Sequence, residues 1–334
     1  MADRQPTMSD VAREAGVSAI TVSRVLNEYE FVKPETRERV LAAVEATGYR
    51  PNLAARALVT RKSHVLGVLV ADAVGHGPTS SLWAIEEAAR EAGYAVTVVS
   101  LRGDDRAAML DGLRRLRAQG VDGIVMIAPQ HEDTQLEIVS IEGTPIVTLS
   151  AFESESVKPI MLDSAEGSRQ AVSHLVGLGH TRIAHLAGPA GWAAAEARLL
   201  GWRDACVAAE LEPGPVVHGD WSAQSGFELV SDLLVDGTVT AIYAASDAMA
   251  QGALLALHGR GVRVPEDVSV VGFDDAPEAE YLIPPLTTVR QDFETLGRRC
   301  IVSVVELIDG RTPDPFRPLV PSLVVRESTA PPRQ

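Results

Sequence analysis

Apolar and polar residues follow two alternating periods from Val65 onward. Apolar runs occur at 65–71, 94–100, 121–128, 144–150, 182–188, 239–246, 268–275 and 319–329. Segments of helical periodicity lie between them, near 79–92, 104–119, 131–141, 165–178, 193–209, 222–236 and 247–259. Strands that alternate with helices form parallel sheets covered on both faces. Because about ten such units exceed one compact sheet, the pattern predicts an α/β body of two similar lobes, each a doubly wound parallel sheet.

The first fifty residues have a different pattern, that of three short helices. The spacing of Thr7 and Asp10 indicates a capping box, and the helix that follows is expected to end at Gly16. Ser18 caps a second helix through about Asn27, and Pro34 lies in the first turn of a third helix that continues to Gly48. Two short helices joined by the tight turn Ala15–Val17 predict a helix-turn-helix.

The second helix has an apolar and a polar face. Its inward face carries Val22, Val25 and Leu26, and its outward face carries Ile20, Arg24 and Asn27. Arginine pairs with guanine through two hydrogen bonds, and isoleucine contacts the methyl group of thymine in the major groove. Ser18 and Thr21, near the helix N-terminus, suit phosphate contacts. The alternative is a plain helical hairpin whose polar face is merely solvated.

A linker at 49–63 connects these helices to the body. Leu53, Ala54, Ala57 and Leu58 share one helical face. With roughly nine residues, such a helix is shorter than an isolated helix needs in water, so we expect it to order only on a partner. An apolar side chain beside basic residues kinks the minor groove when it enters a base step, and Leu58 is the candidate. The alternative is a simple tether.

The charge distribution agrees with a DNA-facing N-terminus. The whole chain has a net charge of −15, yet residues 1–63 carry ten Lys/Arg and eight Asp/Glu. No acidic residue occurs between Ala46 and Ala71. A slightly basic segment on an acidic body is typical of a protein that binds nucleic acid through one end.

Other features exclude several classes of protein. The N-terminus lacks the apolar core of a signal peptide, and no run is long enough to span a bilayer, so we expect a cytoplasmic protein. Cys206 and Cys300 lie in apolar stretches and are expected to be buried thiols. Neither a metal-binding cysteine pattern nor a cofactor motif is present, and no cofactor or metal is expected.

Several polar residues near the predicted strand ends suit a polyol ligand. The indole of Trp221 can stack on a sugar face, Asp274 can accept two hydrogen bonds from neighbouring hydroxyls, and Arg198 can donate two in a fork. Gln291 and Phe293 lie on a second crossover between the lobes. The alternatives are that Trp221 is an ordinary core residue and that Arg198 is a surface charge.

Several longer segments of the chain carry a family resemblance. They are SDVAREAGVSAITVSRVLN (9–27), VKPETRERVLAAVEATGYRPNLAARAL (32–58), LVGLGHTRIAHLAGP, GDWSAQSGF, VPEDVSVVGFDD and PPLTTVRQDF. In these segments the chain resembles the lactose-repressor family, and its lactose-responsive branch more than its purine-responsive branch. The resemblance implies a repressor of carbohydrate-catabolism genes with a headpiece at 1–50 and a hinge at 51–63. The periplasmic-binding-protein-like lobes are then expected at 64–161 plus 292–318 and at 162–291 plus 319–329.

The resemblance also implies a homodimer on a pseudo-palindromic operator, since one headpiece contacts half a site. Leu58 matches the position that intercalates at the operator centre. Ala19 and Ile20 occupy the positions that set operator preference and differ from the Tyr-Gln pair of the lactose branch. The expected DNA-binding residues are Thr7, Ser18, Ala19, Ile20, Thr21, Ser23, Arg24, Asn27, Asn52, Ala55 and Leu58.

For the effector, the resemblance assigns sugar contacts to Arg198, Trp221, Asp274 and Gln291. Two positions depart from the lactose branch, which has Asn where this chain has Ser246 and Asp where it has Ser150. The segment 76–80 keeps much of the family's pocket loop. The remaining expected effector contacts are His76, Pro78, Ser150, Ser246 and Phe293. A sugar or glycoside bound between the lobes is expected to separate the hinges and release DNA, whereas a corepressor would act with the opposite sign.

Two rival classes are disfavoured. A secreted sugar-binding protein would have a signal peptide and no headpiece. An enzyme would need a nucleophile–base pair, and the adjacent Asp274 and Asp275 are expected to point to opposite faces of a strand. His174, His180 and His185 are expected to be structural. The C-terminus carries no leucine heptads, so we expect a dimer rather than a tetramer.

Overall fold

The computed structural model describes residues 6–26, 29, 31–49, 62–71, 75–101, 106–127, 140–141, 143–149, 160–234, 237–314 and 317–333. The chain divides into two compact units, Met1–Ser63 and His64–Gln334. We call the first unit the headpiece and the second the body.

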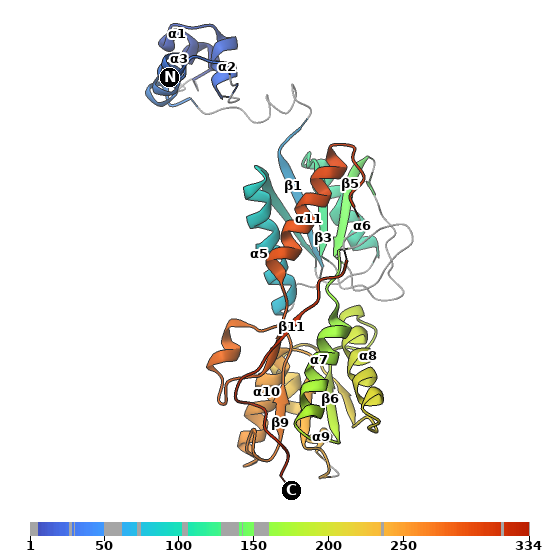
Figure 1. Cartoon of the computed structure of the whole chain (residues 1–334). Helices are drawn as coiled ribbons and strands as arrows, with labels where there is room; N and C mark the ends of the chain where they lie inside the picture. Colours follow the sequence, from blue (N-terminus) through green and yellow to red (C-terminus); the bar gives the residue numbers. More distant parts are fainter. Residues whose placement is uncertain are drawn as a thin grey trace. The chain divides into compact units, whose positions relative to one another are not determined.

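The described residues of the headpiece form the helices α1 (Met8–Ala15), α2 (Ala19–Leu26) and α3 (Pro34–Thr47) (Figure 1). The Asp10 carboxylate accepts hydrogen bonds from the Thr7 backbone N–H and hydroxyl, at 2.9 and 2.6 Å. The Thr21 N–H donates to the Ser18 hydroxyl at 3.1 Å and thereby begins α2. These contacts confirm the predicted caps and the helix-turn-helix. A small core holds the helices together, with Val11, Val22, Val25 and Val40 at its centre.

The first lobe of the body is built on a five-stranded sheet in the order β2-β1-β3-β5-β4. Its strands are β1 (Val65–Ala71), β2 (Ala95–Leu101), β3 (Gly123–Ile127), β4 (Ser140–Ile141) and β5 (Thr144–Leu149). Helices α5 (His76–Glu91) and α11 (Phe293–Ile308) pack on one face, and α6 (Arg106–Ala118) packs on the other (Figure 1). Along β1, Leu66 and Val68 face α5 and α11, whereas Leu69 faces α6, because successive strand residues point to opposite sides.

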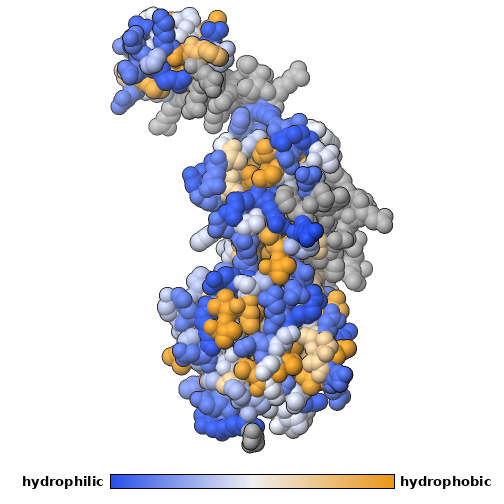
Figure 2. All heavy atoms as spheres, in the orientation of Figure 1, coloured by the Kyte–Doolittle hydropathy of each residue, from blue (hydrophilic) through white to orange (hydrophobic). Residues whose placement is uncertain are grey.

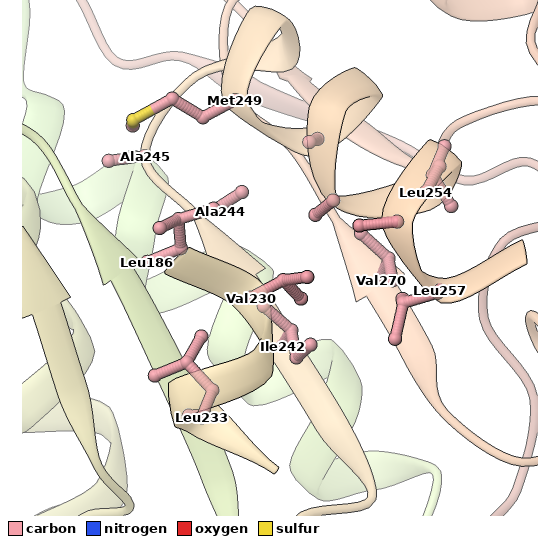
Figure 3. Close-up of a cluster of buried hydrophobic side chains, with 14 of the residues drawn as sticks. Leu186, Val230, Leu233, Ile242, Ala244, Ala245, Met249, Leu254, Leu257 and Val270 are labelled. Atoms are coloured by element: carbon pink, nitrogen blue, oxygen red, sulfur yellow. The ribbon is translucent and has the colours of Figure 1, made fainter. Parts of the chain in front are cut away.

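The second lobe has a four-stranded parallel sheet in the order β7-β6-β8-β9. Its strands are β6 (Ile183–Ala187), β7 (Val216–His218), β8 (Ala241–Ala244) and β9 (Ser269–Val271). One face is covered by α7 (Ser164–Gly177) and α8 (Ala193–Ala208), and the other by α9 (Ala223–Leu233) and α10 (Asp247–Gly259). Figure 3 shows how the side chains of α9 and α10, such as Val230 and Leu257, meet Leu186, Ile242 and Val270 from the sheet.

The chain crosses between the lobes more than once. Ile160 pairs with Leu149 of the first lobe, and Leu162 pairs with Leu319 just before α7 begins. Strand β10 (Thr288–Arg290) leads directly into α11. Strand β11 (Ser322–Val324) returns after Leu319 and pairs with β10 in an antiparallel ribbon. Helix α11 therefore packs on the first lobe although it follows the second lobe in sequence.

The two-lobed α/β body with doubly wound parallel sheets is confirmed, with corrections to its elements. The helix predicted near 131–141 is wrong at its end, because Ser140–Ile141 pair antiparallel with β5 across a turn at Gly143, which has a φ of 86°. Residues 131–139 lie outside the described part of the chain. The final strand, predicted at 319–329, is shorter in the structure, where β11 spans Ser322–Val324. The elements α11, β7 and β10 were not predicted from the sequence.

The helix expected near 79–92 begins at His76, so the segment 76–80, expected as a pocket loop, is the first turn of α5. Pro78 is tolerated there because the first turn of a helix needs no N–H donor at that position.

On the face shown in Figure 2, hydrophilic residues cover most of the described surface and hydrophobic residues form separate small groups. The expected burial of both thiols is confirmed, since Cys206 and Cys300 are almost completely buried. None of the helices in the described part of the chain combines the length and apolar composition that a bilayer crossing requires.

The close crossing of α9 and α10 gives a first prediction. A Cβ atom at Gly252 would lie 1.8 Å from the Ala223 carbonyl oxygen, so Gly252→Ala must push the two helices apart. We expect it to lower the free energy of unfolding by about 1–3 kcal/mol. Gly259→Ala, at the end of the same helix with nothing within 4 Å, is the control and should be neutral or slightly stabilising. Urea unfolding measures both, and equal stabilities would contradict the close contact.

Candidate ligand cavity and nucleic-acid interface

A cavity of about 330 Å³ lies in the body and is lined by residues of both lobes. From the first lobe come residues of β3, β5, α5 and α11, and from the second lobe residues of α8, α10 and the loops after β7 and β9. Of the nine expected effector residues, the structure brings eight to this cavity: His76, Pro78, Arg198, Trp221, Ser246, Asp274, Gln291 and Phe293. The ninth, Ser150, lies outside the described residues.

The polar lining of the cavity includes three buried side chains whose polar atoms lie together, those of Arg198, Asp274 and Gln291. The amide of Gln291 donates to Asp274 Oδ1 at 2.7 Å, and Arg198 Nη2 lies 3.4 Å from the same oxygen. Arg198 Nη1 donates to the Ala245 carbonyl. The guanidinium lies over the ring of Phe273, with 3.9 Å between Cζ and the ring centroid. These contacts hold the three side chains in one orientation and leave Arg198 Nε without a protein partner in the described structure.

Each of these side chains is supplied by a different element. Arg198 projects from α8, Asp274 follows β9, and Gln291 lies between β10 and α11. The backbone N–H of Asp274 donates to the Val289 carbonyl at 2.8 Å, which fixes the carboxylate near the crossover. The arrangement presents fixed donors and acceptors to neighbouring hydroxyl groups, as a polyol site requires.

Asp247 is a cavity residue that the sequence interpretation did not include. It opens α10 beside Ser246 and is almost completely buried. Its carboxylate accepts hydrogen bonds from the Thr288 hydroxyl at 2.5 Å and from the Ala276 N–H at 2.7 Å. Burial and the neighbouring charge of Asp274 raise the pKa of Asp247 to about 8. Burial also raises the pKa of Asp274, although Arg198 acts in the opposite direction.

Aromatic and apolar side chains form the rest of the wall. Trp221 has a φ of 71°, and its indole lies against Gly188, where a Cβ atom would come within 2.3 Å of the ring. The indole of Trp192 lies 6.1 Å from that of Trp221, and the His76 ring lies 5.7 Å from Phe293. The sequence interpretation missed Trp192 and a group of aliphatic residues, namely Ile127, Leu149, Ile160, Leu162, Leu282 and Leu296. The strand pattern marks several of these as buried but does not show that they face a cavity.

The headpiece presents the candidate nucleic-acid interface on α2. Val22 and Val25 are buried, whereas Ala19 and Arg24 are exposed and Ile20 has 67% of its surface accessible. The expected division into an inward and an outward face is therefore confirmed for the described residues of α2, which do not include Asn27. Arg24 lies over the Tyr29 ring, with 5.6 Å from Cζ to the centroid.

The other expected DNA contacts differ in their surroundings. The hydroxyls of Thr7, Ser18 and Thr21 take part in helix caps, with 2.9 Å between those of Ser18 and Thr21. Ser23 is half-buried. Four expected contacts lie outside the described residues, namely Asn27, Asn52, Ala55 and Leu58.

The histidines expected to be structural make contacts within the second lobe. His180 bonds with the Thr240 hydroxyl and the Ala330 carbonyl, at 2.8 and 2.9 Å, and His174 bonds with the Thr329 hydroxyl. His185 stacks on Tyr243 and Trp202, and burial lowers its pKa to about 3. Within the described residues, no group of acidic, histidine or cysteine side chains is arranged to hold a metal ion.

Two parts of the chain match known families. Residues 7–52 match the bacterial regulatory proteins of the lacI family, and residues 172–329 match the periplasmic binding protein-like domain. The chain is 36% identical to the lactose operon repressor of Escherichia coli (strain K12), over 98% of this chain and 91% of that protein. It is 37% identical to the HTH-type transcriptional regulator CelR of Thermobifida fusca, over 97% of this chain and 98% of that protein.

Solved structures show the same similarity in three dimensions. The lac repressor dimer bound to operator and the anti-inducer ONPF superposes with a TM-score of 0.87 at 36% identity, covering 98% of this chain and all of that chain. The complex of the transcriptional regulator CelR with cellobiose superposes with a TM-score of 0.72 at 35% identity, covering 97% of this chain and all of that chain.

The raised pKa of Asp247 predicts a pH dependence. The carboxyl titrates near pH 4 in an unfolded chain but at about 8 in the folded chain. The folded state binds the extra proton between these values, so its contribution to stability is complete at low pH and is lost as the pH rises through 8.

The Asp247→Asn variant carries a side chain that does not ionise. It can donate a hydrogen bond to the Thr288 hydroxyl and accept one from the Ala276 N–H. Thermal unfolding across pH 5 to 9 should therefore show wild type losing stability relative to this variant as the pH rises. A stability difference that stays constant across this range would contradict a buried, protonated Asp247.

Proposed function

The chain belongs to the lacI family of bacterial regulatory proteins, and we propose that it is a transcriptional repressor that a neutral sugar or glycoside releases from its operator. The observation that carries this proposal is the cavity, where Arg198, Asp274 and Gln291 converge beside an indole in a chain that also has a helix-turn-helix. The headpiece supplies the DNA contacts and the body supplies the response to the effector.

Two features support operator binding. The outward residues of α2, Ile20 and Arg24, are those that can contact a thymine methyl and a guanine edge. The related lac repressor has been solved as a dimer bound to operator. We propose that this chain also acts as a homodimer in the cytoplasm, on a pseudo-palindromic site whose symmetry matches its own. The linker at 51–63, with Leu58, is proposed to order on the operator.

The chemistry of the cavity supports a sugar as the effector. A carboxylate, an amide and a guanidinium within hydrogen-bonding reach of one another match the adjacent hydroxyls of a pyranose, and the Trp221 indole offers a flat apolar surface to its C–H face. Related proteins bind cellobiose and ONPG. Ser246 and Ser150 replace residues of the lactose branch, so we propose a sugar other than lactose.

The charges in the cavity favour a neutral ligand. Arg198 is the only lysine or arginine among the described lining residues, and it already contacts Asp274 and the Ala245 carbonyl. Two buried carboxyl groups, Asp247 and Asp274, face the same space. A sugar phosphate or sugar acid would bring a further negative charge beside the Asp274 carboxylate without a free cation to balance it.

The cavity also explains how the effector can act on the headpiece. Its walls come from both lobes, so a bound sugar contacts both and favours the lobe arrangement that it fits best. We propose that this arrangement is incompatible with simultaneous ordering of the two linkers of a dimer on DNA. The sugar shifts the equilibrium only to the extent that it binds the two arrangements unequally.

Ligand selectivity is the direct test of the cavity. In a thermal-shift screen of glucose, cellobiose, ONPG, glucuronate and glucose 6-phosphate, we expect a neutral compound to raise the melting temperature by mass action. The charged analogue of that sugar should bind at least about tenfold more weakly. Arg198→Lys, which keeps the charge and loses the fork, should weaken the neutral ligand. No stabilisation by any neutral sugar would argue against a sugar effector.

Operator recognition is tested by selecting binding sites from a random duplex pool. We expect a pseudo-palindromic site and, for Arg24→Ala, a loss of about 1–3 kcal/mol of binding free energy with relaxed preference at one base pair of each half-site. Arg39, exposed on α3, supplies the control. Arg39→Ala should change affinity for all sequences evenly, if at all. Selection of no common sequence would refute a sequence-specific repressor.

A further inference from the structure

The carboxylate at the centre of the cavity is followed by an unusual stretch of backbone. Asp274 has a φ of 121° and Asp275 a φ of 54°, so two consecutive residues other than glycine lie in the left-handed region. For a residue other than glycine, even one such backbone conformation is unfavourable, and it persists only when surrounding contacts hold it. Gln291 and Arg198 hold the Asp274 carboxylate inside the cavity, and further contacts must hold the backbone at Asp274 and Asp275.

Asp275 provides the first of these contacts by pairing with two arginines. Its Oδ2 lies 2.6 Å from Arg290 Nε and its Oδ1 lies 2.7 Å from Arg326 Nη2. The Asp275 side chain is only 8% exposed, and that of Arg326 15%. Arg326 also donates to the Leu286 carbonyl at 2.8 Å, so its guanidinium is held independently of Asp275. A buried carboxylate that pairs with two guanidinium groups, one of them also held by a carbonyl oxygen, resists rotation of its own backbone.

The residues on either side are held as well. The Asp274 N–H donates to the Val289 carbonyl at 2.8 Å, and the Ala276 N–H donates to Asp247 at 2.7 Å. Thr288, whose hydroxyl donates to Asp247, lies between these contacts on β10. Residues 274–276 are thus fixed from β10, from the start of α10 and from the segment that follows β11.

The two arginines lie beside segments that connect the lobes. Arg290 is the last residue of β10, directly before Gln291 and the first turn of α11 in the first lobe. Arg326 follows β11, which returns from the first lobe after Leu319 has paired with Leu162. A movement of the crossing segments therefore displaces the partners of Asp275, and Asp275 transmits the displacement to the neighbouring Asp274.

We propose that Asp275, Arg290 and Arg326 form a clamp that positions the Asp274 carboxylate in the cavity and makes its affinity for ligand depend on the crossing strands. These are positioning residues, since they act on the ligand through Asp274. The role in ligand binding rests on the proposed sugar effector, whereas the effect on the backbone at 274–276 does not.

The first experiment needs no ligand. Asp275→Asn keeps a residue type that tolerates the left-handed region and removes the charge. Hydrogen exchange should then be faster at the amides of 274–276, with protection unchanged in β6 and β8. The control is Asp267→Asn, because Asp267 also pairs with two arginines, Arg263 and Arg333, on the exposed surface of the same lobe. Unchanged exchange at 274–276 in Asp275→Asn would overturn the clamp.

The second experiment measures affinity by calorimetry, with the neutral sugar that stabilises wild type most among glucose, cellobiose and ONPG. Asp275→Asn should weaken binding by roughly three- to thirtyfold, and Asp267→Asn should leave it unchanged. In the Asp274→Asn background the Asp275→Asn change should have little further effect, because it acts through the side chain already altered. Equal weakening in both backgrounds would show a general structural role and contradict the proposal.

If Asp275→Asn does not fold, Arg290→Gln is the second variant that tests the clamp. The Arg290 side chain is 58% exposed, so its loss should be tolerated, and it should speed exchange at 274–276 and weaken the sugar to a smaller extent in the same direction. If no neutral sugar stabilises wild type, the proposed effector is wrong, and the exchange measurement alone decides on the clamp. Arg290→Gln with wild-type exchange and wild-type affinity would count against it.

Discussion

The contact between the buried guanidinium of Arg198 and the buried carboxylate of Asp274 constrains much of the body. Ions taken out of water are stable only when partners satisfy them. Gln291 and the Ala245 carbonyl supply those partners, and they come from the crossover and from the end of β8. The cavity therefore exists in this form only when the second sheet, α8 and the crossing segments are all in place. This dependence is what allows a small ligand to influence the arrangement of the lobes.

The same constraint connects binding to function. A sugar that exchanges hydrogen bonds with Asp274 and Gln291 acts on a residue at the end of β9 and on a residue between β10 and α11. Because α11 packs on the first lobe, the ligand contacts the path by which that lobe is joined to the second. The antiparallel ribbon of β10 and β11, with Asp275 and its two arginines beside it, lies on this path. A rearrangement of the lobes thus needs no contact between the ligand and the headpiece.

Much of the fold follows from local patterns in the sequence. The alternation of apolar runs and helical segments predicted two parallel sheets because buried strands such as 65–71 need helices on both faces. Helix α11 is absent from the predicted elements, although Leu296, Cys300 and Val304 recur at helical spacing. The helix expected at 131–141 fails at Ser140–Ile141 because pairing with β5 across Gly143 overrides local propensity.

The candidate site, like the fold, could be predicted from the sequence only in part. Arg198, Asp274 and Gln291 are single polar residues in otherwise ordinary elements. Their places near predicted strand ends made them candidates, with a core or surface role as the alternative, and the resemblance to a family assigned them sugar contacts. Asp247 and Trp192 were missed because nothing in their own segments distinguishes them from a helix start or a core residue. The pairing of Asp275 with Arg326 joins residues far apart in sequence. Such a contact depends on the return of the chain from the first lobe, which no local pattern specifies.

We propose that the cavity and the DNA-binding surface share one conformational equilibrium. Linkage requires that a sugar lower operator affinity by the same factor by which the operator lowers sugar affinity. Both factors are measurable at one salt concentration, by anisotropy of a labelled operator titrated with and without saturating sugar and by calorimetry of the sugar with free and operator-bound protein. With one shared equilibrium, we expect two equal factors, both in the direction of release. Operator affinity that is unchanged or increased by a sugar that binds would contradict this proposal.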